Sequence, residues 1–466
     1  MLVYSTMSRT KEEFEPLKGR IVKMFVCGPT VYDYPHIGHA KTYVAMDVVA
    51  RYLHFKGYSV FYVQNITDID DKIINRAKEQ GISAEELAER FLRIYYEDME
   101  RLNIKSVSLF ARATQHVDEI IEQIEDLIAK GYAYESNGSV YFDVSKFGDF
   151  GNLSGQRKEE LVAGARVEVD ENKRSPEDFA LWKKMKEDEP FWDSPWGRGR
   201  PGWHIEDTAI SINYLGQQYD MHGGGIDLIF PHHEAEIAIA ESITGKKPFV
   251  RYWLHTGFLL VNGEKMAKSL GNFLTIREIL KSYDPMALRF FLLYAHYRSP
   301  IDFSYDLLNE ATEAYDRLDN SFRKALEAQD TEEREEKELR ETLESCRKKF
   351  FDAMDDDFNT REAIAALFPL AKAINQSVLT DDRAVTELKE FIGEISGILG
   401  LFEHRGEVSV KPEIIDGVLE IRRILREEKR YDLADMIRGK LGECGIEIED
   451  RGKETKWRIS QRSTDQ

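Results

Sequence analysis

The first part of the chain alternates between short apolar runs and a longer segment in which apolar residues have helical spacing. Residues 21–27 (IVKMFVC) form a nearly continuous apolar run, which is typical of a strand buried on both faces. Residues 58–64 (YSVFYVQ) form a second run of this kind. In the segment between them, apolar residues recur three and four positions apart: Met46, Val49, Ala50 and Leu53. Strand, helix and strand at this spacing predict a βαβ unit in a parallel sheet, whose ligands bind at the carboxyl ends of the strands.

The pattern changes after this unit. A helix is predicted at about 115–130, and Asn137-Gly138 between two apolar stretches predicts a β-hairpin. This α+β segment interrupts the alternation, which resumes near Gly202, and we interpret it as an insertion. From about Leu307 the chain has a helical pattern, and Pro412 marks a boundary before a small terminal domain. We therefore expect five segments: the first half of a nucleotide-binding domain at 1–110, a connective insertion at 111–200, the second half of the nucleotide-binding domain at 201–306, a helical bundle at 307–408, and a C-terminal domain at 409–466.

Composition favours a globular enzyme over a membrane or secreted protein. Of the 466 residues, 42% are hydrophobic and 32% are charged, and no apolar run is long enough to span a bilayer. Residues 1–20 lack the apolar core of a secretion signal, and the three cysteines are too few and too far apart for a disulfide framework. We expect a cytoplasmic protein with no membrane partner.

The charge balance bears on possible partners. A net charge of −20 is unusual for a nucleic-acid-binding protein, but such binding needs a local basic surface rather than a basic total. From Lys411 to the end we count 13 basic and 13 acidic residues, so the rest of the chain carries the whole −20. The terminal domain is therefore the relatively basic part, although an ordinary charged helical domain has the same composition.

A first candidate site follows the first predicted strand and opens the predicted helix. Its sequence is Pro35-His36-Ile37-Gly38-His39. Backbone amides at a helix N-terminus favour anions, and two imidazoles one turn apart add hydrogen-bond donors for phosphate oxygens. Gly38 would leave room for a base or a ribose against the backbone. A bare string of this length also fits a helix start that happens to hold two histidines, but the strand–loop–helix setting favours a phosphate site.

A second candidate site is Lys265-Met266-Ala267-Lys268-Ser269. Asn262-Gly263 precedes it, so we expect it to lie on a loop. Phosphoryl and nucleotidyl transfer is catalysed mainly by positioned positive charge, and two lysines on a loop can close on a triphosphate. The other interpretation is a solvated charged loop, which is usual for a pair of lysines.

Together the two sites are far more specific than either alone. They resemble the HIGH and KMSKS motifs of class I aminoacyl-tRNA synthetases, with Ala267 where a serine is usual and with both lysines present. Longer stretches resemble the cysteinyl-tRNA synthetases: residues 25–40, 65–73, 199–206, 222–236, 353–360, 434–441 and 456–458. The resemblance covers nearly the whole chain. It implies an α/β fold: a Rossmann-type parallel-sheet catalytic domain with an inserted α+β connective domain, then a helical bundle and a small C-terminal anticodon-binding domain.

Cys27, His232 and Glu236 are candidate metal ligands. His232 and Glu236 are four residues apart on a predicted helix and share a face, and a thiolate, an imidazole and a carboxylate together suit zinc. By themselves they are weak indicators, because a cysteine at a strand end is more often a core residue. The resemblance implies one zinc ion per chain on these three residues and on a fourth cysteine, whose position here holds Asp207. A soft metal that binds the substrate thiolate would make sulfur obligatory, which pocket shape alone does not.

The resemblance also implies the remaining substrate contacts. It places Thr67, Trp203 and His204 around the cysteine, although Trp203 equally fits a buried core position. It implies an ATP site formed by the first motif, the lysine loop and a glycine-rich stretch: Pro35, Ile37, Gly38, His222, Gly223, Gly224, Gly225, Asp227, Met266 and Ser269. The expected catalytic groups hold the phosphates and stabilise their charge, with Mg²⁺ accompanying ATP: His36, His39, Lys265 and Lys268.

The activity that the resemblance implies is ATP-dependent activation of L-cysteine to cysteinyl-adenylate and its transfer to the 3′ end of tRNA(Cys), by a ligase that we expect to be monomeric. The C-terminal part would bind the anticodon end through Trp457 and Arg458, or these residues would only pack locally. Two alternatives stay open. One is a ligase that joins cysteine to an amino sugar on the same catalytic domain, and the C-terminal domain argues against it. The other is a non-catalytic tRNA-binding paralogue, and the presence of both motifs argues against that.

Overall fold

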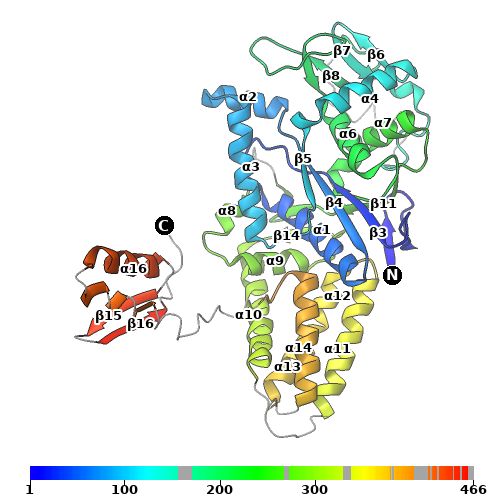
Figure 1. Cartoon of the computed structure of the whole chain (residues 1–466). Helices are drawn as coiled ribbons and strands as arrows, with labels where there is room; N and C mark the ends of the chain where they lie inside the picture. The colour runs from blue at the N-terminus through cyan, green and yellow to red at the C-terminus, as the bar shows by residue number, and fades with distance from the viewer. Residues whose placement is uncertain are drawn as a thin grey trace. The chain divides into compact units, whose positions relative to one another are not determined.

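The computed structural model of the chain describes two compact units. The first unit runs from Met1 to Phe402 and the second from Glu403 to Gln466 (Figure 1). The described residues are 1–155, 171–266, 272–328, 337–377, 379, 382–403, 418–419, 422–423, 425–427, 430–443, 446–451 and 454–459.

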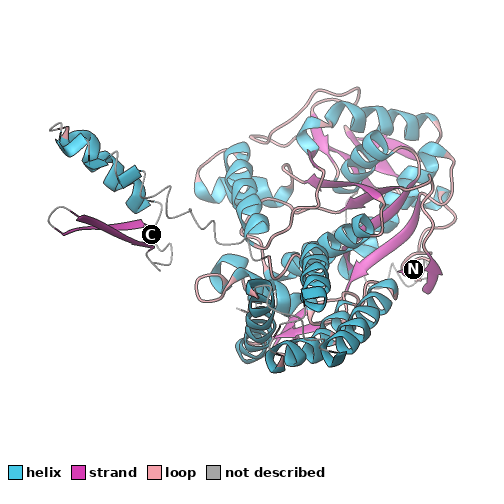
Figure 2. Ribbon diagram, turned by 60° about the horizontal axis from the view of Figure 1, so that its bottom comes forward, coloured by secondary structure: helices cyan, strands magenta, loops and turns pink. Residues whose placement is uncertain are grey.

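A five-stranded parallel sheet forms the centre of the first unit (Figure 2). Its strands, in spatial order, are β11 (Val250–Thr256), β10 (Tyr219–Gly225), β3 (Ile21–Val26), β4 (Ser59–Ile66) and β5 (Leu109–Arg112). The two apolar runs predicted as strands are the neighbours β3 and β4, and helix α1 (Ile37–Phe55) connects them. The predicted βαβ unit is confirmed. The strand order reverses at β3, which pairs with β4 on one side and with β10 on the other.

Two hydrophobic cores cover the two faces of this sheet. Alternate residues of β3 enter different cores, because side chains along a strand point to opposite faces. Met24 and Val26 pack in the core that contains α1, whereas Phe25 and the following Cys27 pack in the other core. Three helices contribute to this second core: α4 (Val117–Ala129), α6 (Trp203–Leu215) and α7 (Glu234–Thr244). Cys27 therefore faces the same layer as α6 and α7.

The inserted segment forms a sheet of its own. Its antiparallel strands, in order, are β6 (Ala133–Ser136), β7 (Ser139–Phe142), β8 (Phe179–Lys184) and β9 (Gly199–Pro201). The predicted hairpin is confirmed, and Asn137 and Gly138 at its turn both have positive φ, 54° and 79°. In Figure 1 this sheet lies at one end of the parallel sheet, beside α4.

The remaining elements of the first unit surround the parallel sheet. Two helices follow β4, namely α2 (Asp71–Gln80) and α3 (Ala84–Arg101). At the N-terminus β1 (Leu2–Ser5) pairs with β2 (Thr10–Glu13). After β11 come β12 (Leu259–Val261), β13 (Glu264–Lys265), α8 (Ile276–Ile279), α9 (Pro285–Leu293) and β14 (Ile301–Phe303), of which β13, β12 and β14 form a sheet.

A helical bundle completes the first unit, as predicted. Its helices are α10 (Tyr305–Glu327), α11 (Lys337–Asp355), α12 (Thr360–Ala365), α13 (Leu367–Gln376) and α14 (Asp382–Leu399). A buried ion pair links helix α1 to this bundle. Asp47 of α1 accepts from Arg289 of α9 at 2.6 Å, and Arg289 also donates to the carbonyl oxygen of Leu399 in α14 at 2.8 Å. Because both charged groups are fully buried, breaking this pair would leave an uncompensated charge in the core.

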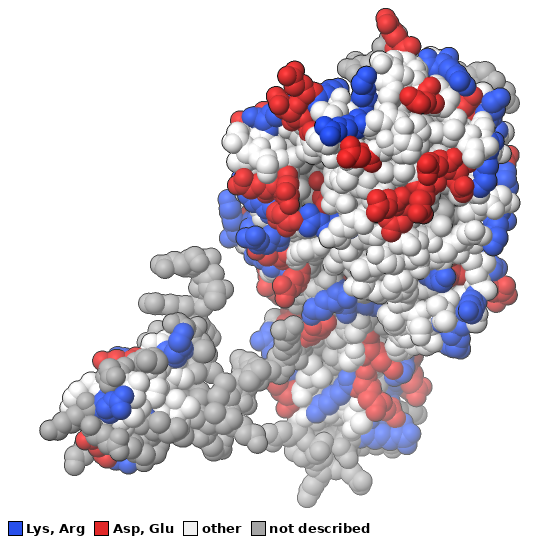
Figure 3. Space-filling model, turned by 45° about the horizontal axis from the view of Figure 1, so that its top comes forward, with Lys and Arg blue, Asp and Glu red and all other residues white. Residues whose placement is uncertain are grey.

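The second unit contains helix α16 (Tyr431–Glu443) and an antiparallel hairpin of β15 (Ile446–Arg451) and β16 (Glu454–Ile459). In this hairpin Trp457 is opposite Ile448 and Arg458 is opposite Glu447. Within the described residues, no helix has the length and apolarity needed to cross a membrane. Figure 3 shows acidic and basic side chains interspersed over one face of the first unit, without a single large basic patch on that face.

Candidate active site

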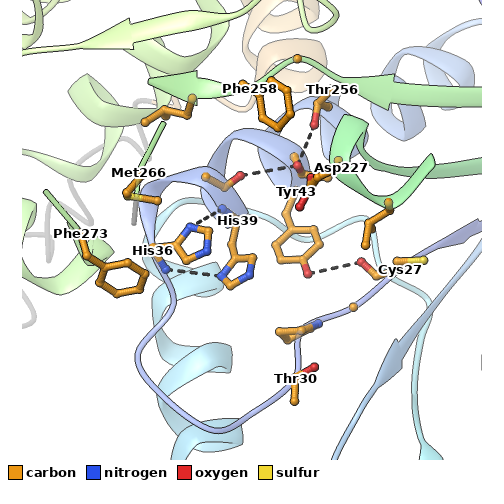
Figure 4. Close-up of a pocket in the computed structure, with 18 of the residues that line it drawn as sticks. Cys27, Thr30, His36, His39, Tyr43, Asp227, Thr256, Phe258, Met266 and Phe273 are labelled. Carbon is orange, nitrogen blue, oxygen red and sulfur yellow. Dashed lines mark hydrogen bonds between the residues drawn. The ribbon is translucent and has the colours of Figure 1, made fainter. Parts of the chain in front are cut away.

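A cavity of about 330 Å³ lies where the parallel strands end (Figure 4). It sits beyond β3, at the reversal of strand order, which is the usual ligand position in open α/β sheets. Its volume falls within the roughly 300–1,000 Å³ of small-ligand sites. Its walls come from the end of β3, the start of α1, and the segments after β10 and β11, and they include Cys27, His36, His39, Trp203, Asp227 and Phe258.

His36 and His39 cap the start of α1 by bonding to each other's backbone. The His39 N–H donates to His36 Nδ1 at 3.3 Å, and the His36 N–H donates to His39 Nδ1 at 3.4 Å. The rings stack with their centroids 3.7 Å apart. Because each Nδ1 is an acceptor, a neutral ring carries its proton on Nε2. Burial, followed by the electrostatic influence of His36 and Lys72, lowers the pKa of His39 well below its usual value, so this ring is neutral at pH 7.

The other three residues of the first motif support this arrangement. A Cβ on Gly38 would lie 2.9 Å from two atoms of the His36 ring, so the glycine is required by the imidazole that packs on it. Pro35 and Ile37 do not line the cavity. Their backbones pair with the segment after the lysine loop: the Ile37 N–H donates to the Leu274 carbonyl oxygen, and the Pro35 carbonyl oxygen accepts from Ile276.

The lysine loop begins at the cavity. Met266 lines it, and the Met266 sulfur accepts from the Leu274 N–H at 3.4 Å. Phe273, on the far side of the loop, also lines the cavity (Figure 4). The side chain of Lys265 and the whole of Lys268 and Ser269 lie outside the described residues. The two described ends of the loop thus lie beside His36, and the rings of His36 and Phe273 have centroids 5.2 Å apart.

The four expected metal ligands come together at the base of the cavity. Ligand atoms of Cys27, Asp207, His232 and Glu236 all lie within 4.8 Å of one another, and all four residues are buried. Asp207 Oδ2 is 3.1 Å from Cys27 Sγ and 3.1 Å from His232 Nε2. Glu236 Oε1 is 3.1 Å from His232 Nε2. Of these four residues, Cys27 is the one that also lines the cavity.

The electrostatics of this cluster suit a cation. Burial, together with Asp207 and Glu236, raises the pKa of the Cys27 thiol well above its usual value. Burial and the nearby Asp207 likewise raise the pKa of Glu236. Glu236 Oε2 is buried and has no hydrogen-bond partner among the described residues. A sulfur, a nitrogen and two carboxylates crowded together, with one buried oxygen unsatisfied, fit a divalent metal of the zinc type.

Asp207 is directed into the cluster, not away from it. Asn65 Nδ2 donates to Asp207 Oδ1 at 2.6 Å, which leaves Oδ2 facing Cys27 and His232. Asn65 was not expected from the sequence, although it opens the 65–73 stretch that carries the family resemblance. Such outer residues orient the ligands of a metal site.

Of the three residues expected around the substrate cysteine, one lines the cavity and two lie behind its wall. Trp203 lines the cavity and stacks on the His232 ring, with centroids 4.1 Å apart at 19°. Trp203 is 38% exposed, so it is a wall residue and not a core aromatic. His204 and Thr67 lie behind the wall: His204 Nδ1 is 2.8 Å from His232 Nδ1, and the Thr67 hydroxyl donates to Glu206. Glu206, a buried carboxylate next to Asp207, was also not expected from the sequence.

The glycine-rich stretch at the end of β10 also contains residues that line the cavity and residues that lie beneath it. Gly225 and Asp227 line the cavity, whereas Gly223 and Gly224 do not. A Cβ on Gly223 would lie 2.8 Å from the Met46 sulfur, and one on Gly224 would lie 2.8 Å from the His233 ring. These two glycines therefore permit close packing of side chains beneath the cavity. His222 is fully buried and stacks on Trp253.

Comparison with protein families matches three consecutive parts of the chain. The family described as tRNA synthetases class I (C) catalytic domain matches residues 13–313, the DALR domain matches 349–403, and the cysteinyl-tRNA ligase anticodon binding domain matches 411–458. Among curated proteins, the cysteine-tRNA ligases of Thermococcus gammatolerans and Pyrococcus furiosus are 51% and 52% identical to this chain. Each alignment covers 98% of this chain and 98% of the relative. That of Carboxydothermus hydrogenoformans is 49% identical over 98% of this chain and 100% of its own.

Solved structures give the same fold. Methionyl-tRNA synthetase of Mycobacterium tuberculosis, in complex with methionyl-adenylate, superposes with a TM-score of 0.59 at 16% identity and covers 86% of this chain and 94% of its own. The LeuRS of Agrobacterium radiobacter K84 superposes with a TM-score of 0.60 at 11% identity, over 82% and 84% of the two chains. The predicted class I architecture is therefore confirmed. Since the relatives are about half identical over nearly the full length, the chain belongs to the cysteine-tRNA ligases, a family of class I aminoacyl-tRNA synthetases.

Proposed function

We propose that this ligase assembles cysteinyl-adenylate at the junction of the cavity and the metal cluster, and then transfers cysteine to the 3′ end of tRNA(Cys). The observation that carries the proposal is the double position of Cys27, which lines the cavity and also belongs to the metal cluster. A thiol-binding group and a phosphate-binding wall therefore adjoin. A substrate with a thiol and a carboxylate on adjacent carbons can reach both at once.

We assign the cluster of Cys27, Asp207, His232 and Glu236 to one zinc ion. This ion would bind the sulfur of the substrate, and it would reject serine because an oxygen is a much poorer ligand for a soft site. His232 presents Nε2 to the cluster, and its Nδ1 bonds to His204 at 2.8 Å. Trp203 holds the His232 ring from the cavity side by stacking. Trp203 and His204 therefore orient the metal ligand His232, in addition to the substrate contact expected for them.

ATP occupies the cavity in this proposal, with its phosphates against the start of α1. The Nε2–H groups of His36 and His39 donate to phosphate oxygens, aided by the helix N-terminus. A cysteine carboxylate oxygen attacks the α-phosphorus, the bond from this phosphorus to the oxygen that bridges it to the β-phosphate breaks, and pyrophosphate leaves. Mg²⁺ bound to ATP would neutralise part of the charge of the phosphates. Lys265 and Lys268 stabilise the charge that develops on the phosphates. Gly225, at the end of β10, and Asp227, just after it, line the cavity, and we assign them to the nucleoside side.

Transfer follows in the same cavity. A hydroxyl of the terminal adenosine attacks the carbonyl carbon of the adenylate, the ester bond to the tRNA forms, and AMP leaves. We propose that the segments 307–408 and 409–466 bind the rest of the tRNA, with Trp457 and Arg458 of β16 as contacts to the anticodon end. We further propose that 1–110 and 201–306 form the catalytic domain, interrupted by 111–200. We propose a monomer that works in the cytoplasm.

The two alternative functions are not favoured. A ligase for an amino sugar has no use for an anticodon binding domain, which matches residues 411–458 of this chain. A non-catalytic paralogue has no use for a buried metal cluster that opens on a nucleotide-sized cavity.

The experiment is a pair of assays on the purified, zinc-loaded chain. Pyrophosphate–ATP exchange should depend on cysteine, should not respond to serine, and should need no tRNA. A chain that ends at Glu403 should keep this exchange but lose tRNA charging, because only the second unit is removed. Absence of exchange in the intact protein would refute the activation step. Equal loss of both activities in a truncated chain that retains its melting transition would refute the division of labour.

A further inference from the structure

Lys41 is a buried cation on helix α1, close to the first motif. It lies two residues after His39, is 2% exposed, and does not line the cavity. Lysine is rarely buried to this extent unless its charge is paired. Within the described part of the chain, no carboxylate pairs with this ammonium group. It donates instead to three backbone carbonyl oxygens, those of Gly257 and Ser299 at 2.6 Å each and that of Phe258 at 3.3 Å.

The three acceptors belong to two chain segments that meet beside the cavity. Gly257 and Phe258 follow β11, and Ser299 precedes β14. The segments also bond directly, because the Gly257 N–H donates to the Tyr297 carbonyl oxygen at 2.9 Å. They pass so closely that a Cβ on Gly257 would lie 2.6 Å from the backbone oxygen of Ser299. Lys41 therefore fixes both segments to α1 through one atom, its Nζ.

The segment after β11 forms part of the cavity wall. Residues 256–259 line the cavity, and Figure 4 shows Thr256 and Phe258 among the lining side chains. Phe258 is 37% exposed, so an apolar ring is available to a ligand at this wall. Thr256 is the register partner of Gly225 in the pairing of β11 with β10. The segment therefore adjoins the wall that we assign to the nucleoside side of ATP.

Thr42, the residue after Lys41, makes a second link to this wall. Its Oγ1 lies 2.7 Å from Thr256 Oγ1, and Thr42 itself lines the cavity. Lys41 and Thr42 thus hold the wall within the first two turns of α1. In the proposed function His36 and His39 bind the phosphates at the start of the same helix. Because the hydrogen-bonded backbone of a helix fixes the spacing along it, the wall and the two histidines keep a fixed separation.

We propose that Lys41 is a positioning residue for ATP in cysteine activation: it fixes wall residues 256–259 to α1, and so sets the distance between the nucleoside wall and the phosphate-binding histidines. This inference rests on the proposed function, because it takes ATP as the occupant of the cavity. An error of about 1 Å in the position of a bound substrate can cost about 100-fold in rate. The metal cluster contains no residue of α1 or of this wall, so loss of Lys41 should leave cysteine and zinc binding nearly unchanged.

The wild type and three variants test the proposal. Lys41→Met keeps an apolar side chain but has no donor, whereas Lys41→Arg can donate to all three carbonyl oxygens. Lys324→Met is the matched control, because Lys324 also donates to three backbone carbonyl oxygens but lies on α10 of the helical bundle. Calorimetry without cysteine measures the affinity for ATP. Pyrophosphate–ATP exchange gives the KM for ATP and the KM for cysteine.

We expect Lys41→Met to bind ATP more weakly and to lose about 10- to 100-fold in kcat/KM for ATP. Its KM for cysteine and its zinc content should stay within about twofold of the wild type. Lys41→Arg should recover most of the ATP affinity, and Lys324→Met should keep the wild-type affinity. If Lys41→Met does not fold, Lys41→Gln takes its place: it keeps two N–H donors on a shorter side chain, and it should show a smaller loss of the same kind.

An ATP affinity of Lys41→Met within about twofold of the wild type would overturn the proposal. An equal loss in Lys324→Met, or a parallel loss of cysteine affinity or zinc in Lys41→Met, would attribute the effect to general packing and overturn it as well. Failure of the proposed function gives a different result: the wild type would bind ATP but show no cysteine-dependent exchange. The calorimetric comparison of Lys41→Met with the wild type would still decide whether Lys41 positions ATP.

Discussion

Asn65 and Asp207 are joined by a hydrogen bond of 2.6 Å, from the Asn65 amide to Asp207 Oδ1. The carbonyl oxygen of the same Asn65 side chain accepts from the Gly28 N–H at 2.6 Å. One side chain therefore links the aspartate on α6 to the strand end that carries Cys27. This close approach needs the glycine, because a Cβ on residue 28 would lie 1.6 Å from the Asn65 backbone oxygen.

Asn65→Ala should weaken zinc binding although Asn65 is not a ligand. Without its amide, Asp207 can rotate away from Cys27 and His232, and loss of such an outer contact typically costs about 10–100-fold in metal affinity. Competition with a chromophoric chelator measures the change. Asn213→Ala is the control, since Asn213 is an exposed residue of α6, the helix that also carries Asp207. Equal affinity in wild type and Asn65→Ala would mean that Asp207 needs no orientation.

Asp207→Cys should raise the affinity for zinc, because a thiolate is a softer and stronger donor to zinc than a carboxylate. It should also widen the preference for zinc over Mn²⁺. Asp207→Ala should lower the affinity. Metal analysis after dialysis against both ions compares the three proteins. If Asp207→Ala kept its zinc but bound cysteine weakly, Asp207 would act on the substrate ammonium instead of on the metal.

Lys268→Ala should lower the rate of cysteine activation more than it changes the KM for cysteine. Its charge is expected to act on the phosphates in the transition state, so kcat should fall while ground-state binding of the amino acid is nearly unchanged. Pyrophosphate–ATP exchange over a range of cysteine concentrations separates the two constants. Activity within about twofold of the wild type would exclude Lys268 as the working charge of its loop.

Lys41 should make folding stability depend on pH. Its ammonium group, buried on α1, donates to the carbonyl oxygens of Gly257 and Ser299 at 2.6 Å each, beside the cavity wall. Burial lowers the pKa of Lys41 from 10.5 to about 7. Between these values the unfolded chain holds a proton that the folded chain has lost, so the free energy of unfolding contributed by this group rises with pH.

The measurement for Lys41 is the melting temperature across this pH range. Lys41→Met removes the titrating group, so the Tm of the wild type relative to the variant should increase from pH 7 toward pH 10. Lys146→Met, at an exposed position, should show no such trend. A constant difference between wild type and Lys41→Met at all pH values would contradict the prediction.

Local pattern was sufficient for the elements that frame the site. The apolar runs of β3 and β4 and the spacing in α1 predict the βαβ unit, and Asn137-Gly138 predicts the hairpin of the insertion. The i, i+4 spacing of His232 and Glu236 predicts that they share a helix face, and their closest atoms are 3.1 Å apart. These features depend on residues close in sequence, so periodicity and turn chemistry report them.

The rest depends on contacts between distant segments. Asn65 and Asp207 are 142 positions apart, and Cys27 and His233 are 206 apart, so no local period relates them. His232 and His233 are consecutive and lie in the helical turn Ile229–His233 that precedes α7, so their side chains point in different directions. The His232 ring contacts Asp207 and His204, whereas the His233 ring contacts Cys27 and His255, and these contacts exist only once β3 and α7 are packed together. Gly223 and Gly224 stay predicted ATP contacts, and a Cβ on either would meet a side chain from a distant segment, Met46 or His233.

The position of Cys27 at the cavity wall has a kinetic consequence. Among the residues of the metal cluster it is the one that lines the cavity, so we expect an ion bound by this cluster to enter and leave through the cavity. An adenylate that fills the cavity would block the exit of the ion. A chelator should then remove zinc faster from the substrate-free enzyme than from the enzyme with ATP and cysteine bound. The rate of zinc removal, measured with and without the two substrates, tests this expectation. Bound substrates would then protect the zinc from chelators, and lack of cysteine would leave the zinc accessible to them.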